Sequence, residues 1–338
     1  MKIKRLIIIS SVLIVSGLLI AIIVLALNQF KIGDLDNSII SKTYDVSEDF
    51  SSIECNLEVS SLNIYYTTDT ENKVLCLEKE GISFDVKVED NILKIKENNN
   101  IKWYANINFI NNTDVTIFIN KKYLDNFVVN TSTGDISILE QINFNNVSID
   151  GSTAKISFMA YVEENVNIHL STGDVWINKA EMKNLDVKVT TGKIEISECK
   201  ILNNVNLKST TGDMNLLNNI ISNNLEVTKD TGKLTMDTVS CNNVNVKSTT
   251  GDTTFSDVIV NNDAKIESST GRVKLDFCDA KNIYIKTSTG DVSGSIMSYK
   301  IFNVKTDTGK INVPETIEGS KGVCNITTST GDVEIYYN

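Results

Sequence analysis

The clearest copy of a repeated phrase in this chain reads LDVKVTTGKIEI and occupies residues 185–196. Leu185, Val187 and Val189 alternate with polar residues, which is the period of a strand with one buried face. After Gly192 the alternation resumes out of phase at Ile194. A phase change at a glycine is typical of a corner, because glycine adopts backbone angles that other residues avoid. The phrase therefore predicts a strand, a corner and a second strand.

A threonine followed by this corner residue returns every 19 to 22 residues. A fixed period of this size indicates stacked structural units. Because the strands are short and no helical period is present, we predict an all-β chain that forms a parallel β-solenoid of about eleven coils. In most coils an asparagine stands just before an apolar residue, as at Asn184 and Asn204, and marks a further turn. The corner residues are Gly134, Ala154 (in place of glycine), Gly173, Gly192, Gly212, Gly232, Gly251, Gly271, Gly290, Gly309 and Gly331.

The residues that follow the corners form a column of alternating charge. In chain order they are Asp135, Lys155, Asp174, Lys193, Asp213, Lys233, Asp252, Arg272, Asp291, Lys310 and Asp332. Coils stacked in chain order would place every acid between two bases. Such a ladder replaces like-charge repulsion by exposed ion pairs, each contributing about 0–1 kcal/mol. We interpret this column as a structural device for register and solubility.

A second column, four residues before the corner, is rich in lysine. Its lysines are Lys188, Lys208, Lys247, Lys286 and Lys305, and Thr228 and Glu267 interrupt them. A charged column is most often a solvated face. The chain as a whole is acidic, however, with 43 acidic and 32 basic residues. A basic stripe on such a protein predicts a contact with an anionic envelope polymer or with anionic lipid headgroups.

The N-terminal region has the organisation of a membrane-anchored protein. Residues 1–5 form a basic tail, and the apolar run 6–27 is long enough for a helix to cross a bilayer with its basic end in the cytoplasm. We predict a single-pass anchor at the cell membrane, a linker at 28–43 and an extracytoplasmic remainder. Cleavage of the apolar run as a signal peptide, which would give a secreted protein, is the alternative.

The region between the linker and the repeats is rich in strands but not repetitive. Residues 44–129 contain alternating runs, and a turn at 89–91 indicates a hairpin. Because an open strand edge needs cover, we predict that this region forms an antiparallel β cap on the repeat region 130–338.

Composition excludes several classes of function. A net charge of −11 argues against nucleic-acid binding. The six cysteines lack metal-site spacing and are interpreted as buried apolar residues, with a disulfide left open only for Cys55 and Cys76. His169 is the only histidine. Calcium is not expected, because a base would lie between each pair of acids. We therefore predict no cofactor and no metal.

Two catalytic motifs occur, but both are copies of the repeat phrase. Asp-Thr-Gly at 230–232 and 307–309 matches aspartic proteases, which need two such loops side by side, and these copies lie several coils apart. Ser152 and Lys155 match the Ser-x-x-Lys of β-lactamases without the partner motifs. We predict no catalytic residue.

Threonine pairs near the end of the chain raise the question of ice binding. The pairs at 287/289, 306/308 and 328/330 share the phase of inward residues such as Val189. We therefore predict a buried ladder of hydroxyls instead of an exposed array. Lys229 occupies the same phase, although a lysine is costly to bury.

Several segments resemble those of a known family. They are Asp45-Val46-x-x-x-Phe50, the strand 115–119 that leads into Val128-Val129, and the Ser/Thr-Thr-Gly-Asp/Lys phrases. On these residues the chain, over about 44–338, resembles a bacterial putative-adhesin family of unknown function, membrane-anchored β-strand-repeat proteins of the cell envelope. The family commonly has a proline after the strand that ends here at Ile119, where this chain has Asn120. The resemblance implies an extracytoplasmic β-solenoid, no known catalytic residues and an association with envelope-stress systems.

These observations predict a non-enzymatic, membrane-anchored envelope protein that binds polymer, lipid or a partner protein along its regular faces. One alternative is a regulatory ectodomain in envelope-stress signalling. It would need a membrane signalling protein as partner, because residues 1–5 are too short to signal. The other alternative is a β-helix polysaccharide lyase or hydrolase. The segments between coils are short and uniform, so they cannot form the walls of the substrate cleft that such an enzyme needs.

Overall fold

The computed structural model describes residues 39–100, 113–139, 142–317, 319–320 and 322–338, and residues 39–338 form one compact unit. The predicted tail, the predicted transmembrane segment and residues 28–38 of the predicted linker lie outside the described residues. The rest of that linker enters a strand, β1 (Ile40–Val46). In the part of the chain that is described, no helix has the length and apolar character needed to cross a membrane.

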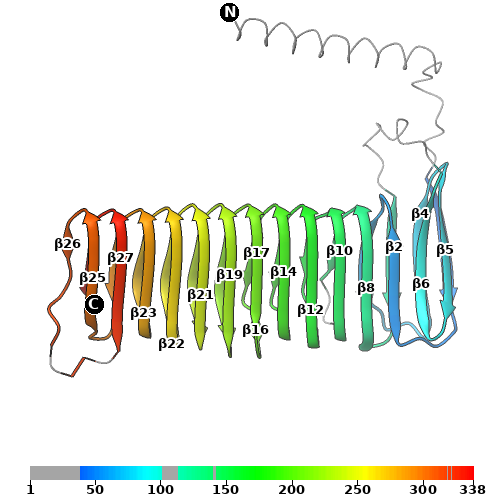
Figure 1. Cartoon of the computed structure of the whole chain (residues 1–338). Helices are drawn as coiled ribbons and strands as arrows, with labels where there is room; N and C mark the ends of the chain where they lie inside the picture. The colour runs from blue at the N-terminus through cyan, green and yellow to red at the C-terminus, as the bar shows by residue number, and fades with distance from the viewer. Residues whose placement is uncertain (1–38, 101–112, 140–141, 318, 321) are drawn as a thin grey trace, which may run out of the picture. The chain divides into compact units, whose positions relative to one another are not determined.

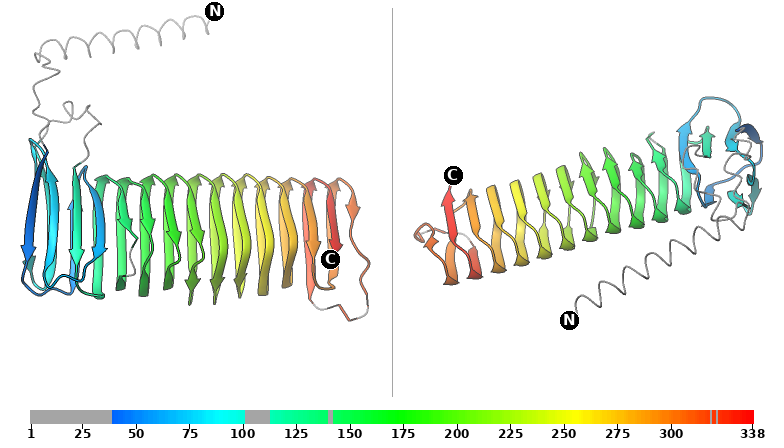
Figure 2. Two further views of the ribbon diagram at one scale, coloured as in Figure 1. Left: turned by 180° about the vertical axis from the view of Figure 1, so that it is seen from behind. Right: turned by 90° about the horizontal axis from the view of Figure 1, so that it is seen from above.

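The predicted all-β parallel solenoid is confirmed. Successive coils lie side by side and pair in parallel (Figures 1 and 2). The pairing is shifted by one repeat, so that Lys188 lies opposite Lys208. The solenoid strands are β8 (Tyr123–Thr133), β9 (Ile136–Ile138), β10 (Asn143–Thr153), β11 (Ile156–Phe158), β12 (Tyr161–Thr172), β13 (Val175–Asn178), β14 (Glu181–Thr191), β15 (Ile194–Ser197), β16 (Lys200–Ile201), β17 (Val205–Thr211), β18 (Met214–Ile221), β19 (Asn224–Thr231), β20 (Leu234–Cys241), β21 (Asn243–Thr250), β22 (Thr253–Thr270), β23 (Val273–Thr289), β24 (Val292–Ile296), β25 (Ile301–Thr308), β26 (Ile311–Asn312), β27 (Val323–Thr330) and β28 (Val333–Tyr337).

Each coil turns first at its corner glycine. The corner glycines have φ values between +114° and +154°, and adjacent corners touch. A Cβ atom on Gly212 would lie 1.8 Å from the carbonyl oxygen of Gly192. The Gly212 N–H also donates to the Thr231 carbonyl of the next coil at 2.9 Å. Glycine is therefore required both by the backbone angle and by the close approach of the neighbouring coil.

A second turn has no common residue type. Its central residues all have φ between 51° and 55°, in the left-handed region: Lys179, Glu198, Asn218, Thr238, Asp257 and Phe277. The predicted asparagine turn follows and carries a ladder of side-chain hydrogen bonds. For example, Asn165 Nδ2 donates to Asn146 Oδ1 at 3.0 Å, and Asn184 Nδ2 donates to Asn165 Oδ1 at 3.1 Å. This ladder satisfies amides that stack at each coil step. We call the segment between the asparagine turn and the corner glycine the front face.

The core consists of columns of apolar residues that point inward from each coil. Val187, Leu207 and Val227 belong to one such column, and each is at most 1% exposed. All six cysteines are buried and free, so Cys55 and Cys76 form no disulfide. Burial raises the pKa of the Cys241 thiol to about 12, which keeps it protonated and unreactive.

The N-terminal cap is only partly antiparallel. β2 (Ser52–Leu57) and β3 (Ser61–Tyr66) pair in parallel with β8 and β9, so solenoid pairing begins before residue 130. The predicted boundary at 129/130 falls inside β8. β6 (Ile92–Asn99) and β7 (Asp114–Ile119) also pair in parallel, with β2 and β3 respectively. Antiparallel pairing begins beyond them: β5 (Ile82–Glu89) pairs with β6, β4 (Asn72–Glu78) pairs with β7, and β1 pairs with β4. The predicted hairpin is confirmed, with Asp90 and Asn91 at positive φ.

The last coils are not stacked in chain order. β27 lies between β23 and β25, and β28 lies between β24 and β26 (Figure 1). As a result Asp332 lies beside Asp291, and the prediction that charge alternates along the whole column is wrong at this point. Every coil carries the same phrase, so the edge of β23 accepts β27 as readily as it would accept β25.

Glu97 binds the backbone of the turn between β2 and β3, at the N-terminal end of the front face. Its carboxylate is 3% exposed and accepts hydrogen bonds of 2.8 to 3.3 Å from the N–H groups of Glu58, Val59 and Ser60. Three consecutive N–H groups that converge on one point form an anion-binding nest, which this chain fills with its own side chain.

Replacing Glu97 by glutamine tests the importance of this nest. Glu97→Gln removes the negative charge and turns one acceptor oxygen into an amide NH2 group, a donor that would face other donors, so we expect the free energy of unfolding to fall by about 2 kcal/mol. Urea denaturation measures the change. Glu58→Gln, which alters an exposed carboxylate, is the control and should stay within about 0.5 kcal/mol of the native protein. Equal losses in both variants would contradict the assignment.

Candidate functional site: a groove along the front face

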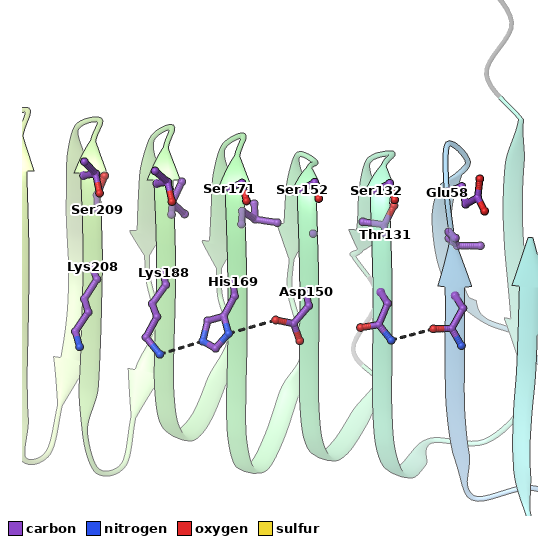
Figure 3. Close-up of a pocket in the computed structure, with 18 of the residues that line it drawn as sticks. Glu58, Thr131, Ser132, Asp150, Ser152, His169, Ser171, Lys188, Lys208 and Ser209 are labelled. Atoms are coloured by element: carbon purple, nitrogen blue, oxygen red, sulfur yellow. Dashed lines mark hydrogen bonds and ion pairs between the residues drawn. The ribbon is translucent and has the colours of Figure 1, made fainter. Parts of the chain in front are cut away.

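A groove follows the solenoid axis along the front face. It extends from β2 to β19 with a volume of about 870 Å³ (Figure 3). A second stretch of about 320 Å³ continues from β19 to β23. Thr228 and Asp230 line both stretches. The walls are two rows of outward side chains, four and two residues before each corner, and the floor is the row between them. The wall two residues before the corner consists of Ser132, Ser152, Ser171, Thr190, Thr210, Asp230, Thr249, Ser269 and Ser288.

Four lysines of the predicted stripe line the other wall, namely Lys188, Lys208, Lys247 and Lys286, and Lys305 continues the same row beyond the groove. We call this row of positions, four residues before each corner, the central row. Lys188 and Lys208 lie on adjacent coils, and Thr228 separates Lys208 from Lys247. Glu267 separates Lys247 from Lys286. Because β27 is inserted, Thr327 separates Lys286 from Lys305. From Lys208 onward a lysine therefore stands on every second coil, a spacing of about 10 Å at the usual distance between strands.

Sequence reasoning missed the N-terminal half of the central row. Asp150 and His169 occupy the same position four residues before the corner, and they lie in register with Lys188. His169 Nδ1 lies 3.3 Å from Asp150 Oδ1, and His169 Nε2 lies 3.3 Å from Lys188 Nζ (Figure 3). Their position in the repeat could have revealed them. Asp150 and His169 each stand four residues before a corner residue, as Lys188 stands four residues before Gly192.

The lysines of the central row differ in their surroundings. Lys188 also pairs with Asp186 at 3.2 Å, and Lys305 pairs with Asp307 at 3.6 Å. Lys208, Lys247 and Lys286 are exposed, and no carboxylate of the described residues forms an ion pair with them. These three ammonium groups are the ones open to an external anion.

The groove floor is mixed in character, with apolar residues such as Leu170 and Val189 in the first stretch and mostly hydroxyl-bearing residues after them. The hydroxyls of Thr131, Ser209, Ser248, Ser268 and Thr287 are buried without a hydrogen-bond partner among the described residues. Thr328 is also buried, whereas Thr289, Thr308 and Thr330 are exposed. Burial of the predicted threonines is thus confirmed for Thr287 and Thr328, Thr306 is half-buried, and the prediction is wrong for the position next to the corner.

Lys229 belongs to the floor and is only 1% exposed. Its Nζ donates to the carbonyl oxygens of Gly232 at 2.6 Å and Gly251 at 3.4 Å. Burial lowers the pKa of this ammonium group to about 8, although Asp213 and Asp252 act in the opposite direction.

The aspartates of the alternating charge column each accept a hydrogen bond from a backbone N–H group of the neighbouring coil. Asp174 Oδ1 accepts from the Lys193 N–H at 2.8 Å, and Asp213 Oδ1 accepts from the Lys233 N–H at 2.7 Å. The same contact is made by Asp135, Asp252, Asp291 and Asp332. Among the described residues, one direct ion pair occurs within the column, Arg272 with Asp252 at 3.0 Å. Aspartates in this column therefore bind the N–H of the next coil, a more specific role than the predicted ion-pair ladder.

The described residues do not assemble a known catalytic or metal-binding arrangement. No group of three or more histidine, cysteine, aspartate or glutamate side chains is placed to hold a metal ion among them. Asp230 and Asp307 lie five coil steps apart once the inserted β27 is counted, which is about 24 Å and too far to share a proton. In the Ser-x-x-Lys match, the Lys155 side chain lies over the Trp176 ring, with Nζ 4.0 Å from the ring centroid.

The fold and the groove define an all-β repeat protein that presents a regular polar face on a parallel solenoid. The chain belongs to the Toastrack DUF4097 family, whose model matches residues 50–240 and 232–338. This agrees with the resemblance seen in the sequence.

Solved structures that match this chain come from several bacteria. One, described as a putative adhesin from Bacteroides fragilis, is 13% identical, covers 89% of this chain and 98% of its own, and has a TM-score of 0.39. Another, described as a putative lipid binding protein from Parabacteroides distasonis, is 12% identical with the same coverage and a TM-score of 0.42. A putative cell adhesion protein from Clostridium sporogenes is 14% identical, covers 89% and 100%, and has a TM-score of 0.20. We draw no functional conclusion from likenesses this distant. Among curated proteins, none matches this chain.

Proposed function

We propose that this protein is a non-enzymatic envelope protein, tethered to the membrane by residues 6–27, whose front face binds an extended anionic polymer along the solenoid axis. The observation that carries the proposal is the central row, where lysines recur on every second coil from Lys208 onward and where Lys208, Lys247 and Lys286 line an axial groove. A ligand that follows this row must be long and must carry anions at a matching interval.

The spacing of the lysines defines the polymer more closely. Lys208, Lys247, Lys286 and Lys305 recur at about 10 Å. A polysaccharide with one carboxylate for every two sugars suits this interval better than one with a carboxylate on each sugar. The opposite wall of the groove is mostly serine and threonine, whose hydroxyls can donate to and accept from sugar hydroxyls.

A binding experiment with matched polymers tests the proposal. The full chain is titrated with hyaluronan (one carboxylate per two sugars), polygalacturonate (one per sugar) and neutral dextran. We expect the tightest binding to hyaluronan and none to dextran. Replacement of the five central-row lysines by glutamine should weaken hyaluronan binding by about tenfold or more.

The control variant removes the same charge elsewhere. Replacing Lys179, Lys183, Lys200, Lys274 and Lys281 by glutamine changes five lysines outside the groove and should leave binding unchanged. Equal binding by both variants would contradict the proposal. Capture of a membrane protein from envelope extracts by both variants would favour the regulatory alternative, and binding to anionic vesicles in place of the polymers would favour lipid as the ligand.

A further inference from the structure

The coil formed by β25 and β26 leaves one end of the solenoid open. β25 pairs with β27 and β26 pairs with β28, and no other described strand pairs with either of them. The inward residues of β25, such as Phe302 and Val304, are only half-buried, whereas their neighbours Cys324 and Ile326 in β27 are fully buried. Ile301 and Ile311 are 43% and 47% exposed. Unpaired backbone groups beside exposed core residues form a surface that favours pairing with another strand.

The opposite end of the solenoid is unsuited to this surface. Its outer strand β5 carries the charged residues Asp85, Lys87 and Glu89 on its outward side, and Lys87 pairs with both acids, at 3.7 and 2.8 Å. Charged side chains on an edge strand oppose strand addition unless the added strand brings their complement. β5 presents two acids and one base, whereas β25 presents one base, Lys305, and one acid, Asp307, so a head-to-tail contact would leave an acid of β5 without a complement. Head-to-tail stacking of copies is therefore disfavoured, and the open end is left to meet an identical open end.

We propose that β25 pairs with β25 of a second copy of this chain, antiparallel and about a two-fold axis, to form an end-to-end dimer. Such an axis perpendicular to the sheet keeps inward residues inward in both copies, and it makes the contact self-complementary.

Charge selects the register of this pairing. Lys305 and Asp307 both point outward, with side chains 75% and 62% exposed. With Thr306 on the two-fold axis, Lys305 of each copy lies opposite Asp307 of the other, so two ion pairs form. A shift that places Lys305 on the axis brings two lysines together instead, which is unfavourable.

The dimer would extend the proposed function without depending on it. Because both front faces lie on the same side of the joined sheet, the two central rows follow one another along a common axis, and one particle can contact a longer stretch of polymer.

Charge exchange tests the dimer and its register together. Sedimentation of the full chain over a range of concentrations should give twice the mass of one chain. Lys305→Glu alone and Asp307→Lys alone each place like charges opposite one another, and each should raise the dimer Kd by about tenfold or more. An equal mixture of the two variants restores opposite charges and should dimerise again. Both positions are exposed, so both variants should keep the native thermal unfolding curve, and Lys247→Glu serves as the charge control.

The results separate clearly. Dimerisation of the native chain, its loss in both single variants and its return in the mixture would establish the interface. A monomeric native chain at all concentrations would overturn the proposal. Association of the single variants at the native Kd, or a mixture that stays monomeric, would also overturn it.

Discussion

A single methyl group at the centre of the corner column should unfold much of the solenoid. We expect Gly212→Ala to lower the free energy of unfolding by about 4 kcal/mol or more. The new Cβ would lie 1.8 Å from the Gly192 carbonyl oxygen and 2.6 Å from its carbon, and φ is +148°. Backbone of the adjacent coil cannot move aside without breaking its hydrogen bonds to both neighbours. Urea denaturation followed by circular dichroism measures the loss.

Two control substitutions separate the causes of this loss. Gly319 has φ of +89° with nothing within 4 Å of a built Cβ, so Gly319→Ala reports backbone strain alone and should cost about 1 kcal/mol. Ala154, the one corner residue that is not glycine, does not have a positive φ. Ala154→Gly should therefore cost no more than about 1 kcal/mol. A Gly212→Ala variant as stable as Gly319→Ala would show that the corners are not close-packed.

Lys229 should be the most unfavourable residue of the groove floor. Its folded-state pKa of about 8 lies below the ordinary value of 10.5, so the unfolded chain binds the proton more tightly. At pH 7 the buried charge therefore costs about 3 kcal/mol. We expect Lys229→Met to raise the free energy of unfolding by an amount approaching this value, since an apolar chain of similar length removes the charge.

The pH dependence of this effect has a definite sign. Between pH 8 and 10.5 the unfolded state holds a proton that the folded state has lost, so the stability of the native protein rises with pH in this window. The advantage of Lys229→Met should be full below pH 8 and vanish towards pH 10.5. Thermal unfolding of both proteins across this range measures the difference. Lys247→Met, at an exposed lysine, should show no such trend, and a constant difference for Lys229→Met would contradict the assignment.

Most of the solenoid could be predicted because its signals repeat. The corner glycine, the alternation around it and the asparagine turn each recur in nearly every coil. A pattern repeated this often does not arise by chance, so each copy supports the prediction of a coil. The turn at Lys179, Glu198 and Phe277 could not be predicted, because these residues share a backbone angle but no chemistry. The order of the last coils was equally hidden, since identical phrases make every coil edge compatible with every other.

The candidate site was predictable only in outline. The lysine column was visible in the sequence, but its even spacing was not, because Lys286 and Lys305 stand in consecutive phrases and Thr327 enters between them from a later segment. Burial of Lys229 was also unexpected, since propensity alone places a lysine outside. Its ammonium group is accommodated by the carbonyl oxygens of the corner glycines, a contact that depends on the stacking of two coils.

The salt dependence of polymer binding tests the central claim most directly. Affinity for hyaluronan is measured at several salt concentrations for the native chain and for the variant with glutamine at the five central-row positions. If the lysines contact the polymer anions, native affinity falls steeply as salt rises, and the dependence becomes nearly flat in the variant. Equal dependence on salt in the two proteins would show that the central row is not where the polymer binds.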